Sequence, residues 1–308
     1  MIRTRNLTKV YGKLMALENL NLVVNEGEIF GYIGPNGAGK TTTLKILATL
    51  LAPTSGSAEV CGLAVGRDSR KIRPLIGYMP DFFGVYEDMT VEEYLTFFAA
   101  AYRITGDKRR RIVGEVLELT DLAGKRDSMV EALSRGMQQR LGLARTLVHD
   151  PRVLILDEPA SGLDPRARIE IRALLKEVKN MGKTIIISSH ILTELSELCD
   201  TIGILEKGQL LFSGTQKELA RKVGTGSIIE VGVADRLEAA RDCLRASPHV
   251  QSVEVHNDHL HVALAPESPN HSFIPQLLVE NGYQVTLLQE EAVKLEDIFL
   301  RATKGVVA

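Results

Sequence analysis

The sequence lacks the features of a disulfide-linked, zinc-binding or membrane-spanning chain. It has only three cysteines, Cys61, Cys199 and Cys243, which are far apart and form no C-x-x-C pair, so neither a disulfide framework nor a thiolate zinc site is expected. No run approaches the roughly 18 apolar residues that span a bilayer, and the first residues lack the apolar stretch of a signal peptide. We therefore expect a cytoplasmic chain that reaches a membrane only through a partner.

The sequence also lacks a strong net charge. Its 37 Lys and Arg residues nearly balance 39 Asp and Glu residues, which leaves a formal charge of -2. Such a chain has no global field with which to hold nucleic acid, so no nucleic-acid partner is expected. Internal repeats and low-complexity tracts are absent too, and the 308 residues have an ordinary globular composition. This length suits one large domain or two smaller ones.

Short apolar runs that alternate with helical patterns predict an α/β core. Three runs have the character of buried strands in a mostly parallel sheet: Ile29–Ile33, Val153–Leu156 and Thr184–Ser189. Residues 90–149 are mainly helical in pattern and begin with the capping box Thr90-x-x-Glu93. We expect an inserted helical lobe at about residues 82–150, in a first domain of residues 1–222 that closes with a hairpin over Cys199–Phe212.

Residues 223–308 predict a smaller accessory or dimerisation domain after the linker Gly224–Ser227. The order strand, helix, strand, strand, helix, strand matches a ferredoxin-like α+β unit. Its central hairpin turns at Asn257-Asp258 and places four polar side chains on one face: Glu254, His256, His259 and His261. These side chains could bind a metal ion, but simple alternation already explains them as the solvent face of the hairpin.

A phosphate-binding loop follows the first buried strand. Its sequence, Gly34-Pro35-Asn36-Gly37-Ala38-Gly39-Lys40-Thr41, fits G-x-x-x-x-G-K-[ST], and a helical pattern follows over Thr42–Leu51. Glycines let successive amides turn toward phosphate oxygens at the positive end of the helix. We expect these residues and Thr42 to hold a nucleotide, with Lys40 at the β- and γ-phosphates and Thr41 on Mg²⁺. A dinucleotide site is disfavoured, because the glycines of this loop are not spaced G-x-G-x-x-G.

Two further strands bring polar groups to the same sheet edge. Asp157 and Glu158 end the second buried run, and paired carboxylates there need a cation. We expect Asp157 to hold Mg²⁺ and Glu158 to accept the proton of the attacking water. His190 ends the third run and can donate to the γ-phosphate.

One further segment narrows the class of P-loop protein, because it resembles the signature motif of ABC transporter ATPases. Its sequence is Leu133-Ser134-Arg135-Gly136-Met137-Gln138-Gln139-Arg140. The other family motifs follow in order over residues 1–220: Tyr11, the P-loop, Ser161-Gly162-Leu163-Asp164 and His190. Two positions depart from the usual pattern. Arg135 stands where a glycine is common, and Asp81 stands where a glutamine usually follows a strand such as Ile76–Met79.

The resemblance implies a head-to-tail dimer, with Ser134 and Gly136 of one subunit closing over the γ-phosphate bound by the other. It also implies that Tyr11 stacks on adenine. Asp81 could still bind Mg²⁺ or water through oxygen, but an ionised carboxylate cannot donate a hydrogen bond. Ser134 would in addition cap the helix that follows it.

As a function, the resemblance implies ATP hydrolysis that drives a separate integral membrane permease, with the ATPase subunits forming a homodimer or heterodimer on the inner face of the membrane. The split-βαβ tail and the segment Leu295–Arg301 are similar to subunits of drug, antibiotic and polysaccharide exporters. Two alternatives remain at this stage: a soluble ABC-type ATPase that acts on nucleic acid or ribosomes, and a small-molecule kinase. The neutral charge argues against the first, and the signature segment is unexplained by the second.

Overall fold

The chain divides into two structural units. The computed structural model describes every residue except 83, 85–87, 223–227, 266–267, 269–270 and 292–308, so the predicted linker Gly224–Ser227 and the segment 295–301 lie outside the described residues. The first unit covers Met1–Gly214, and the second begins at Thr215. Helix α8 (Gln216–Lys222) therefore groups with the second unit, whereas the sequence pattern placed it in the first domain.

A six-stranded sheet forms the centre of the first unit. Its strand order is β11-β10-β4-β9-β8-β7, and all neighbours are parallel except the β10–β11 hairpin. The bounds are β4 (Ile29–Ile33), β7 (Ile76–Met79), β8 (Val153–Asp157), β9 (Thr184–Ser189), β10 (Thr201–Glu206) and β11 (Gln209–Gly214). Every residue of β4, β8 and β9 is buried, which is why these strands are continuous apolar runs in the sequence. The predicted α/β core is confirmed.

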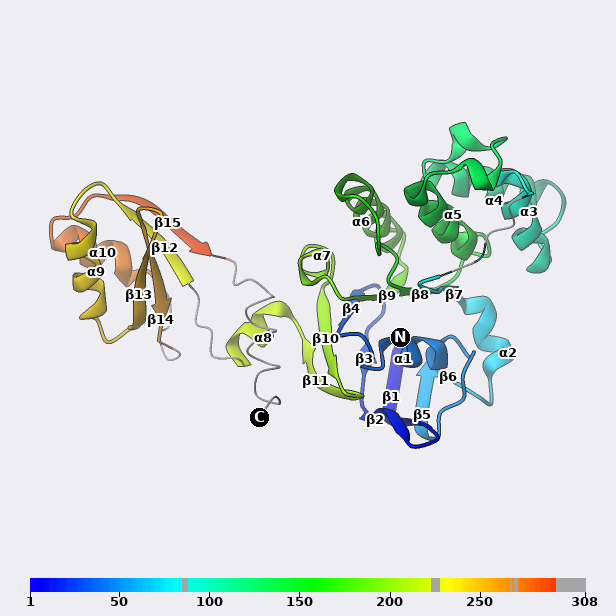
Figure 1. Cartoon of the computed structure of the whole chain (residues 1–308), viewed down its shortest axis with the longest axis horizontal. Helices are drawn as coiled ribbons and strands as arrows, with labels where there is room; N and C mark the ends of the chain where they lie inside the picture. The colour runs from blue at the N-terminus through cyan, green and yellow to red at the C-terminus, as the bar shows by residue number, and fades with distance from the viewer. Residues whose placement is uncertain (83, 85–87, 223–227, 266–267, 269–270, 292–308) are drawn as a thin grey trace. The chain divides into compact units, whose positions relative to one another are not determined.

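A second sheet, which the sequence analysis did not predict, packs beside the first. Its strands are β1 (Ile2–Tyr11), β2 (Leu14–Leu20), β3 (Val23–Val24), β5 (Ser55–Val60) and β6 (Leu63–Ala64), all antiparallel. Helix α1 (Lys40–Leu47) lies between the two sheets (Figure 1), where Leu44 and Ile46 join one apolar core with residues of both. This helix is shorter than predicted at its end, because Ala48 leaves the helical geometry and Thr49 has φ +62°.

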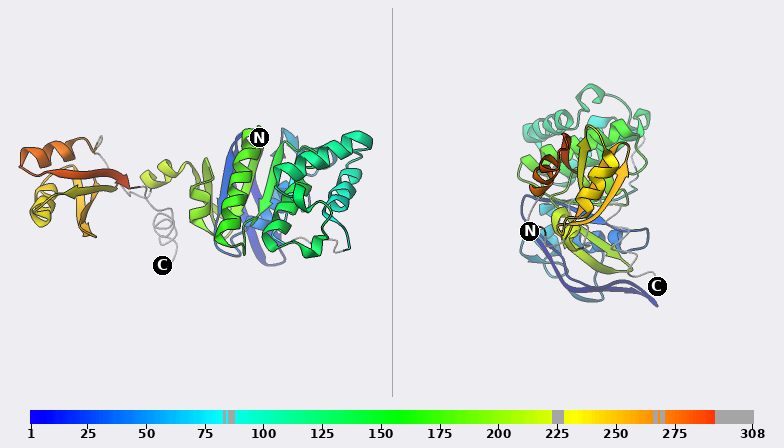
Figure 2. Two further views of the ribbon diagram at one scale, coloured as in Figure 1. Left: turned by 90° about the horizontal axis from the view of Figure 1, so that it is seen from above. Right: turned by 90° about the vertical axis from the view of Figure 1, so that its left-hand side faces the viewer.

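Helices cover the other parts of the first unit. Figure 1 shows α6 (Pro165–Asn180) on the face of the six-stranded sheet opposite α1, with α7 (Leu192–Ser196) on that side as well, and α2 (Ser69–Ile72) leads into β7. Helices α3 (Val91–Ala101), α4 (Gly106–Leu119) and α5 (Arg135–Leu147) group to one side of the sheet, as Figure 2 also shows. Single 3₁₀ turns occur at Arg73–Leu75, Ala123–Lys125 and Val130–Ala132. The helical pattern predicted for residues 90–149 is present.

The second unit has the predicted ferredoxin-like order. It runs through β12 (Ile228–Val233), α9 (Leu237–Arg245), β13 (Val250–His256), β14 (His259–Leu264), α10 (Phe273–Glu280) and β15 (Val285–Glu291). The antiparallel sheet has the order β13-β14-β12-β15, and both helices contribute to its one apolar core. The predicted hairpin turn is also found: Val253 pairs with Val262 and Val255 with Leu260, and Asn257 and Asp258 have positive φ in the turn between them.

The histidines of this hairpin pair locally. The ring of His256 lies 4.9 Å from that of His261 and contacts Glu254, and His259 Nδ1 lies 3.0 Å from Glu230 Oε1. Among the residues that the structure describes, no three His, Cys, Asp or Glu side chains are arranged to hold a metal ion. The described helices also include none that is both long and apolar enough to cross a bilayer.

Candidate active site

The P-loop has a backbone that only glycine allows at two points. Gly37 has φ +82° and Gly39 has φ +107°, and a Cβ atom on Gly39 would lie 2.5 Å from the carbonyl oxygen of Ala16. Helix α1 starts directly after Gly39, and no side chain caps it. The amides of its first turn are therefore left for a ligand, and the helix dipole favours an anion there.

Lys40 is the buried cation of this loop. Its residue surface is 6% exposed, and its ammonium donates to the carbonyl oxygens of Gly34 at 2.6 Å and Pro35 at 3.3 Å. Glu158 Oε1 lies 3.6 Å from the same nitrogen. The buried charge is thus compensated by one carboxylate and two carbonyl groups.

Asp157 and Glu158 lie where β8 ends and are differently bonded. Asp157 Oδ1 accepts a hydrogen bond from Ser188 Oγ at 2.7 Å, whereas Asp157 Oδ2 is buried with no hydrogen-bond partner. Glu158 Oε2 lies 2.7 Å from His190 Nδ1. Since an ionised carboxylate can only accept, Nδ1 of His190 carries the hydrogen in this contact.

These groups open into one pocket of about 400 Å³. It is lined by Tyr11, Leu14, Met15, Ala16, Pro35, Asn36, Gly37, Ala38, Gly39, Lys40, Thr41, Thr42, Asp81, Glu158, Ser161 and His190. Gly34 and Asp157 are buried beside it. The structure therefore gathers the P-loop, Asp81, Glu158 and His190, which lie far apart in the sequence, at one edge of the sheet.

The β1–β2 hairpin forms one wall of this pocket, and Tyr11 is the residue of that wall that the sequence predicted. Tyr11 is 45% exposed, and Lys9 Nζ lies 5.1 Å from the centre of its ring. Tyr11 pairs with Leu14 and Val10 pairs with Met15 across the hairpin, which brings Leu14 and Met15 into the pocket wall. The sequence analysis missed both, although an aromatic residue followed by a turn and two exposed apolar residues is a usable signal for a binding hairpin.

Asp81 adds a third carboxylate to this edge. The pKa of Asp81 is raised, first by partial desolvation of its carboxyl group and then by the negative charges of Asp157 and Glu158, while His190 and Arg135 act in the opposite direction. The negative charges of Asp157 and Glu158 near Asp81 favour a cation at this edge, although the three carboxylates, all among the described residues, do not by themselves form a metal-binding cluster. The hydroxyl of Thr41 and the unpartnered Oδ2 of Asp157 are hard oxygen donors of the kind that Mg²⁺ prefers.

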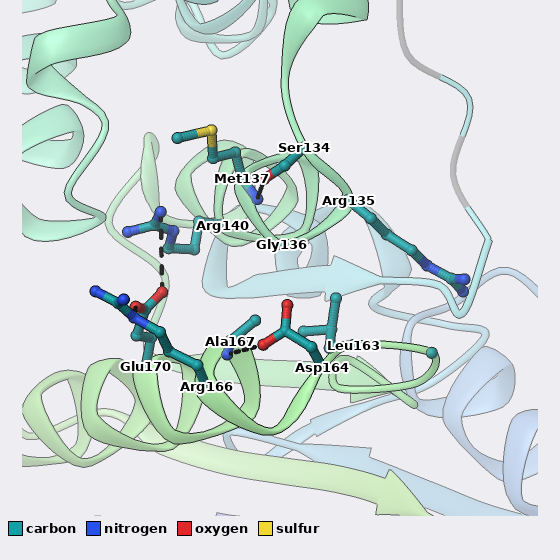
Figure 3. Close-up of a pocket in the computed structure, with 11 residues that line it drawn as sticks. Ser134, Arg135, Gly136, Met137, Arg140, Leu163, Asp164, Arg166, Ala167 and Glu170 are labelled. Atoms are coloured by element: carbon teal, nitrogen blue, oxygen red, sulfur yellow. Dashed lines mark hydrogen bonds and ion pairs between the residues drawn. The ribbon is translucent and has the colours of Figure 1, made fainter.

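Ser134 and Gly136 line a different pocket, of about 340 Å³ (Figure 3). Ser134 is exposed at the start of α5 and accepts a hydrogen bond from the Met137 amide at 3.3 Å, as predicted for a helix cap. Across the pocket, Asp164 caps α6 by accepting from the Ala167 amide at 2.9 Å. Neither Ser134 nor Gly136 lines the P-loop pocket of the same chain.

Relatives with established names match almost the full chain. Residues 17–161 match the family model described as ABC transporter. The chain is 33% identical to the linearmycin resistance ATP-binding protein LnrL of Bacillus subtilis (strain 168), with 98% of each chain covered. It is 35% identical to the bacitracin transport ATP-binding protein BcrA of Bacillus licheniformis, over 99% of this chain and 98% of that protein.

A third relative and two solved structures point to the same family. The Nod factor export ATP-binding protein I of Paraburkholderia xenovorans (strain LB400) is 37% identical over 96% of this chain and 94% of its own. A solved ATP-binding subunit of an ABC transporter superposes with a TM-score of 0.66 and 31% identity, covering 73% of this chain and 93% of that one. A dimeric ATP-binding cassette bound to ADP and Pi superposes with a TM-score of 0.64 and 30% identity, covering 70% of this chain and 98% of that one. This chain therefore belongs to the ATP-binding subunits of ABC transporters, which bind and hydrolyse ATP.

Proposed function

We propose that this chain drives an exporter by binding a separate integral membrane permease on the cytoplasmic face of the membrane. Three relatives that match at least 96% of the chain carry names that refer to antibiotic resistance, antibiotic transport and Nod factor export. This full-length likeness, which includes the second unit, is the observation that carries the proposal. It gives no support to the two alternatives, a soluble ABC-type ATPase that acts on nucleic acid or ribosomes and a small-molecule kinase.

Within the P-loop pocket, Lys40 would exchange its present acceptors for phosphate. Its ammonium now lies against two loop carbonyls and Glu158. Phosphate oxygens carry more negative charge than carbonyl oxygens, so they form the stronger, charge-assisted hydrogen bonds with an ammonium. Binding of ATP would thus draw Lys40 toward the β- and γ-phosphates and away from Glu158.

Glu158 would then act as the proton acceptor for the attacking water, with His190 beside it. A neutral imidazole donates from one nitrogen only, and in this structure Nδ1 donates to Glu158. To donate to the γ-phosphate, His190 must either release Glu158 or carry a second proton. The first route frees the Glu158 carboxylate when the γ-phosphate binds, whereas the second leaves it paired with a cationic His190.

Mg²⁺ would be held by the Thr41 hydroxyl and the Asp157 carboxylate, with Asp81 as a further oxygen ligand. When bound, Mg²⁺ neutralises charge that develops on the transferring phosphoryl group. The three carboxylates at this edge and the buried, unpartnered Oδ2 of Asp157 support this assignment.

Two subunits would close around the nucleotides. Ser134 and Gly136 lie at the exposed start of α5, outside the P-loop pocket of their own chain, so they are placed to meet the phosphate held by a second subunit. Tyr11 would stack on adenine from the exposed rim. The partner ATPase is either a second copy or a related chain.

The carboxylate role of Glu158 is tested with Glu158→Gln. We expect ATP to bind normally while turnover falls at least about 100-fold, because the amide cannot accept the proton of the attacking water. Size-exclusion chromatography with ATP should then show an accumulated dimer. Glu177→Gln makes the same change at an exposed site on α6 and serves as the matched control. A fully active Glu158→Gln variant that stays monomeric would contradict both the role of Glu158 and the closure of two subunits around ATP.

The P-loop assignment is tested with Lys40→Ala. Loss of the buried ammonium should weaken ATP binding by about 10-fold or more, which corresponds to one strong charge-assisted contact. Lys45→Ala removes an exposed lysine from the same helix and should leave ATP affinity within about twofold.

The exporter role is tested separately, by purification of the chain from membranes. Recovery with an integral membrane protein supports this role, and recovery with RNA or DNA alone contradicts it.

A further inference from the structure

Ser188 is a buried hydroxyl on β9, beside the strand β8 whose end carries Asp157 and Glu158. It is the fifth residue of β9, where it pairs with Asp157 of β8 on one side and Tyr32 of β4 on the other. Its side chain is fully buried. None of the motifs considered in the sequence includes it.

The two hydrogen bonds of Ser188 have only one possible direction. Its hydroxyl donates to Asp157 Oδ1 at 2.7 Å and accepts from the backbone amide of Glu158 at 3.0 Å. A carboxylate can only accept and an amide N–H can only donate, so the single hydroxyl hydrogen must point at Asp157. One side chain therefore fixes two consecutive residues of the site.

For Asp157, this contact gives the two carboxylate oxygens different surroundings. Oδ1 is occupied by the serine, and Oδ2 is left buried without a protein partner. An oxygen in that situation costs free energy unless a cation or water joins it. The serine thus selects which oxygen is offered to a ligand and holds the carboxylate plane in place.

For Glu158, the contact supports an unusual backbone. Glu158 has φ +50°, in the left-handed region that non-glycine residues adopt only when their surroundings hold them there. The hydrogen bond from its amide to Ser188 is one such restraint. The same backbone geometry brings the Glu158 carboxylate to Lys40 and His190.

We propose that Ser188 is a positioning residue of the hydrolytic site, which orients Asp157 toward Mg²⁺ and holds Glu158 in its left-handed conformation. This inference rests on the roles proposed above for Asp157 and Glu158. Partners of metal ligands commonly contribute about 10- to 100-fold to metal affinity or activity.

The test compares Ser188→Ala with Ser188→Thr, which keeps the hydroxyl, and with Thr184→Val. Thr184 is also buried on β9, but its hydroxyl accepts from the Gly27 amide at the opposite end of the strand. For each full-length variant, ATP affinity is measured in EDTA and across a Mg²⁺ titration, together with kcat, KM and thermal unfolding.

We expect Ser188→Ala to lower kcat about 10- to 100-fold and to raise the Mg²⁺ concentration needed for half-maximal ATP binding about 10-fold or more. Its ATP affinity in EDTA should stay within about twofold of the wild type, Ser188→Thr should recover most of the Mg²⁺ response, and Thr184→Val should lower only stability. The inference is overturned if Ser188→Ala behaves like Thr184→Val, or if it weakens ATP binding equally with and without Mg²⁺.

Asp157→Asn separates failure of this inference from failure of the proposed function. If Asp157→Asn loses the Mg²⁺ response and Ser188→Ala does not, only the role of Ser188 is wrong. If Asp157→Asn keeps the full response, the assignment of Asp157 fails, and the inference about Ser188 fails with it.

Discussion

His149 is a half-buried imidazole two residues after the end of α5, and one of its ring nitrogens is hydrogen-bonded. Its Nε2 lies 2.8 Å from the carbonyl oxygen of Ile76, and its ring stacks on Tyr102 with the centroids 3.8 Å apart. The carbonyl can only accept, so Nε2 carries the hydrogen and Nδ1 is left buried without a partner. Burial lowers the pKa of His149 below its ordinary value of 6.5, since a second proton would create a poorly solvated charge.

This pKa predicts a loss of stability in acid. Below about pH 6.5 the unfolded chain takes up a proton at His149 more readily than the folded chain, so the free energy of unfolding decreases as the pH falls. Urea denaturation of the full chain at several pH values from 7.5 to about 5.5 measures this slope. His149→Phe keeps an aromatic ring beside Tyr102 but cannot titrate, so its slope should be shallower. Equal slopes for the two proteins would show that His149 does not contribute.

At this same scale, motif spacing was sufficient to locate the P-loop, Asp157, Glu158 and His190, because each follows a strand whose apolar run is unmistakable. Ser188 was beyond reach, since its role depends on the register of β9 against β8, and a hydroxyl in a run of buried residues has no distinguishing pattern. The same holds for the unpartnered Oδ2 of Asp157. The direction of these hydrogen bonds follows only from the positions of the atoms.

Helices α3 and α4 begin in chemically different ways, although a threonine precedes each. Thr90 forms a complete capping box with Glu93: its hydroxyl accepts from the Glu93 amide, and its own amide donates to the Glu93 carboxylate at 2.9 Å. Thr105 precedes α4, and its side chain makes no capping hydrogen bond. The two threonines therefore provide a test position, Thr90, and a matched control position, Thr105, for the effect of helix capping.

Thr90→Ala should lower the free energy of unfolding by about 0.5–2 kcal/mol, because the Glu93 amide loses its acceptor. Thr105→Ala should change it by much less. Chemical denaturation of both variants beside the wild type makes the comparison. The prediction fails if the two substitutions cost the same.

The elements that the sequence predicted best are those with the strongest local signals. Strands β4 and β9 have the predicted bounds, because full burial makes them uninterrupted apolar runs closed by glycine or polar residues. The β1–β5 sheet was not predicted, since much of β1 faces solvent and its pattern of buried and exposed positions is irregular. Its register against β5 shifts after Arg5, and such an irregularity blurs the alternation that identifies strands.

Among the residues that the structure describes, each of the two units has an apolar core of its own. One joins the two sheets of the first unit around α1, and the other lies beneath the helices of the second unit and includes Leu244 and Val253. The ATP pocket is built only from residues of the first unit. Damage to the second core should therefore leave nucleotide binding intact.

Leu244→Ala tests this separation. The side chain is fully buried, so its truncation should destabilise the second unit by about 2–5 kcal/mol. The affinity for ATP should stay within about twofold, as measured by titration below the unfolding transition. Val279→Ala, at a position 62% exposed on α10, is the control and should change neither property. A large loss of ATP affinity in Leu244→Ala alone would show that the two units are energetically linked.

The place of β4 in its sheet has a consequence for synthesis. Strand β4 lies between β9 and β10, both of which follow it by most of the length of the first unit. While the nascent chain leaves the ribosome, the P-loop is made early but has no neighbouring strand until residues 184–206 emerge. Such distant pairings fold slowly and leave apolar edges open in the meantime. ATP can therefore assist folding of this subunit only after residues 184–206, His190 among them, have been added, when about a third of the 308 residues still remains to be translated.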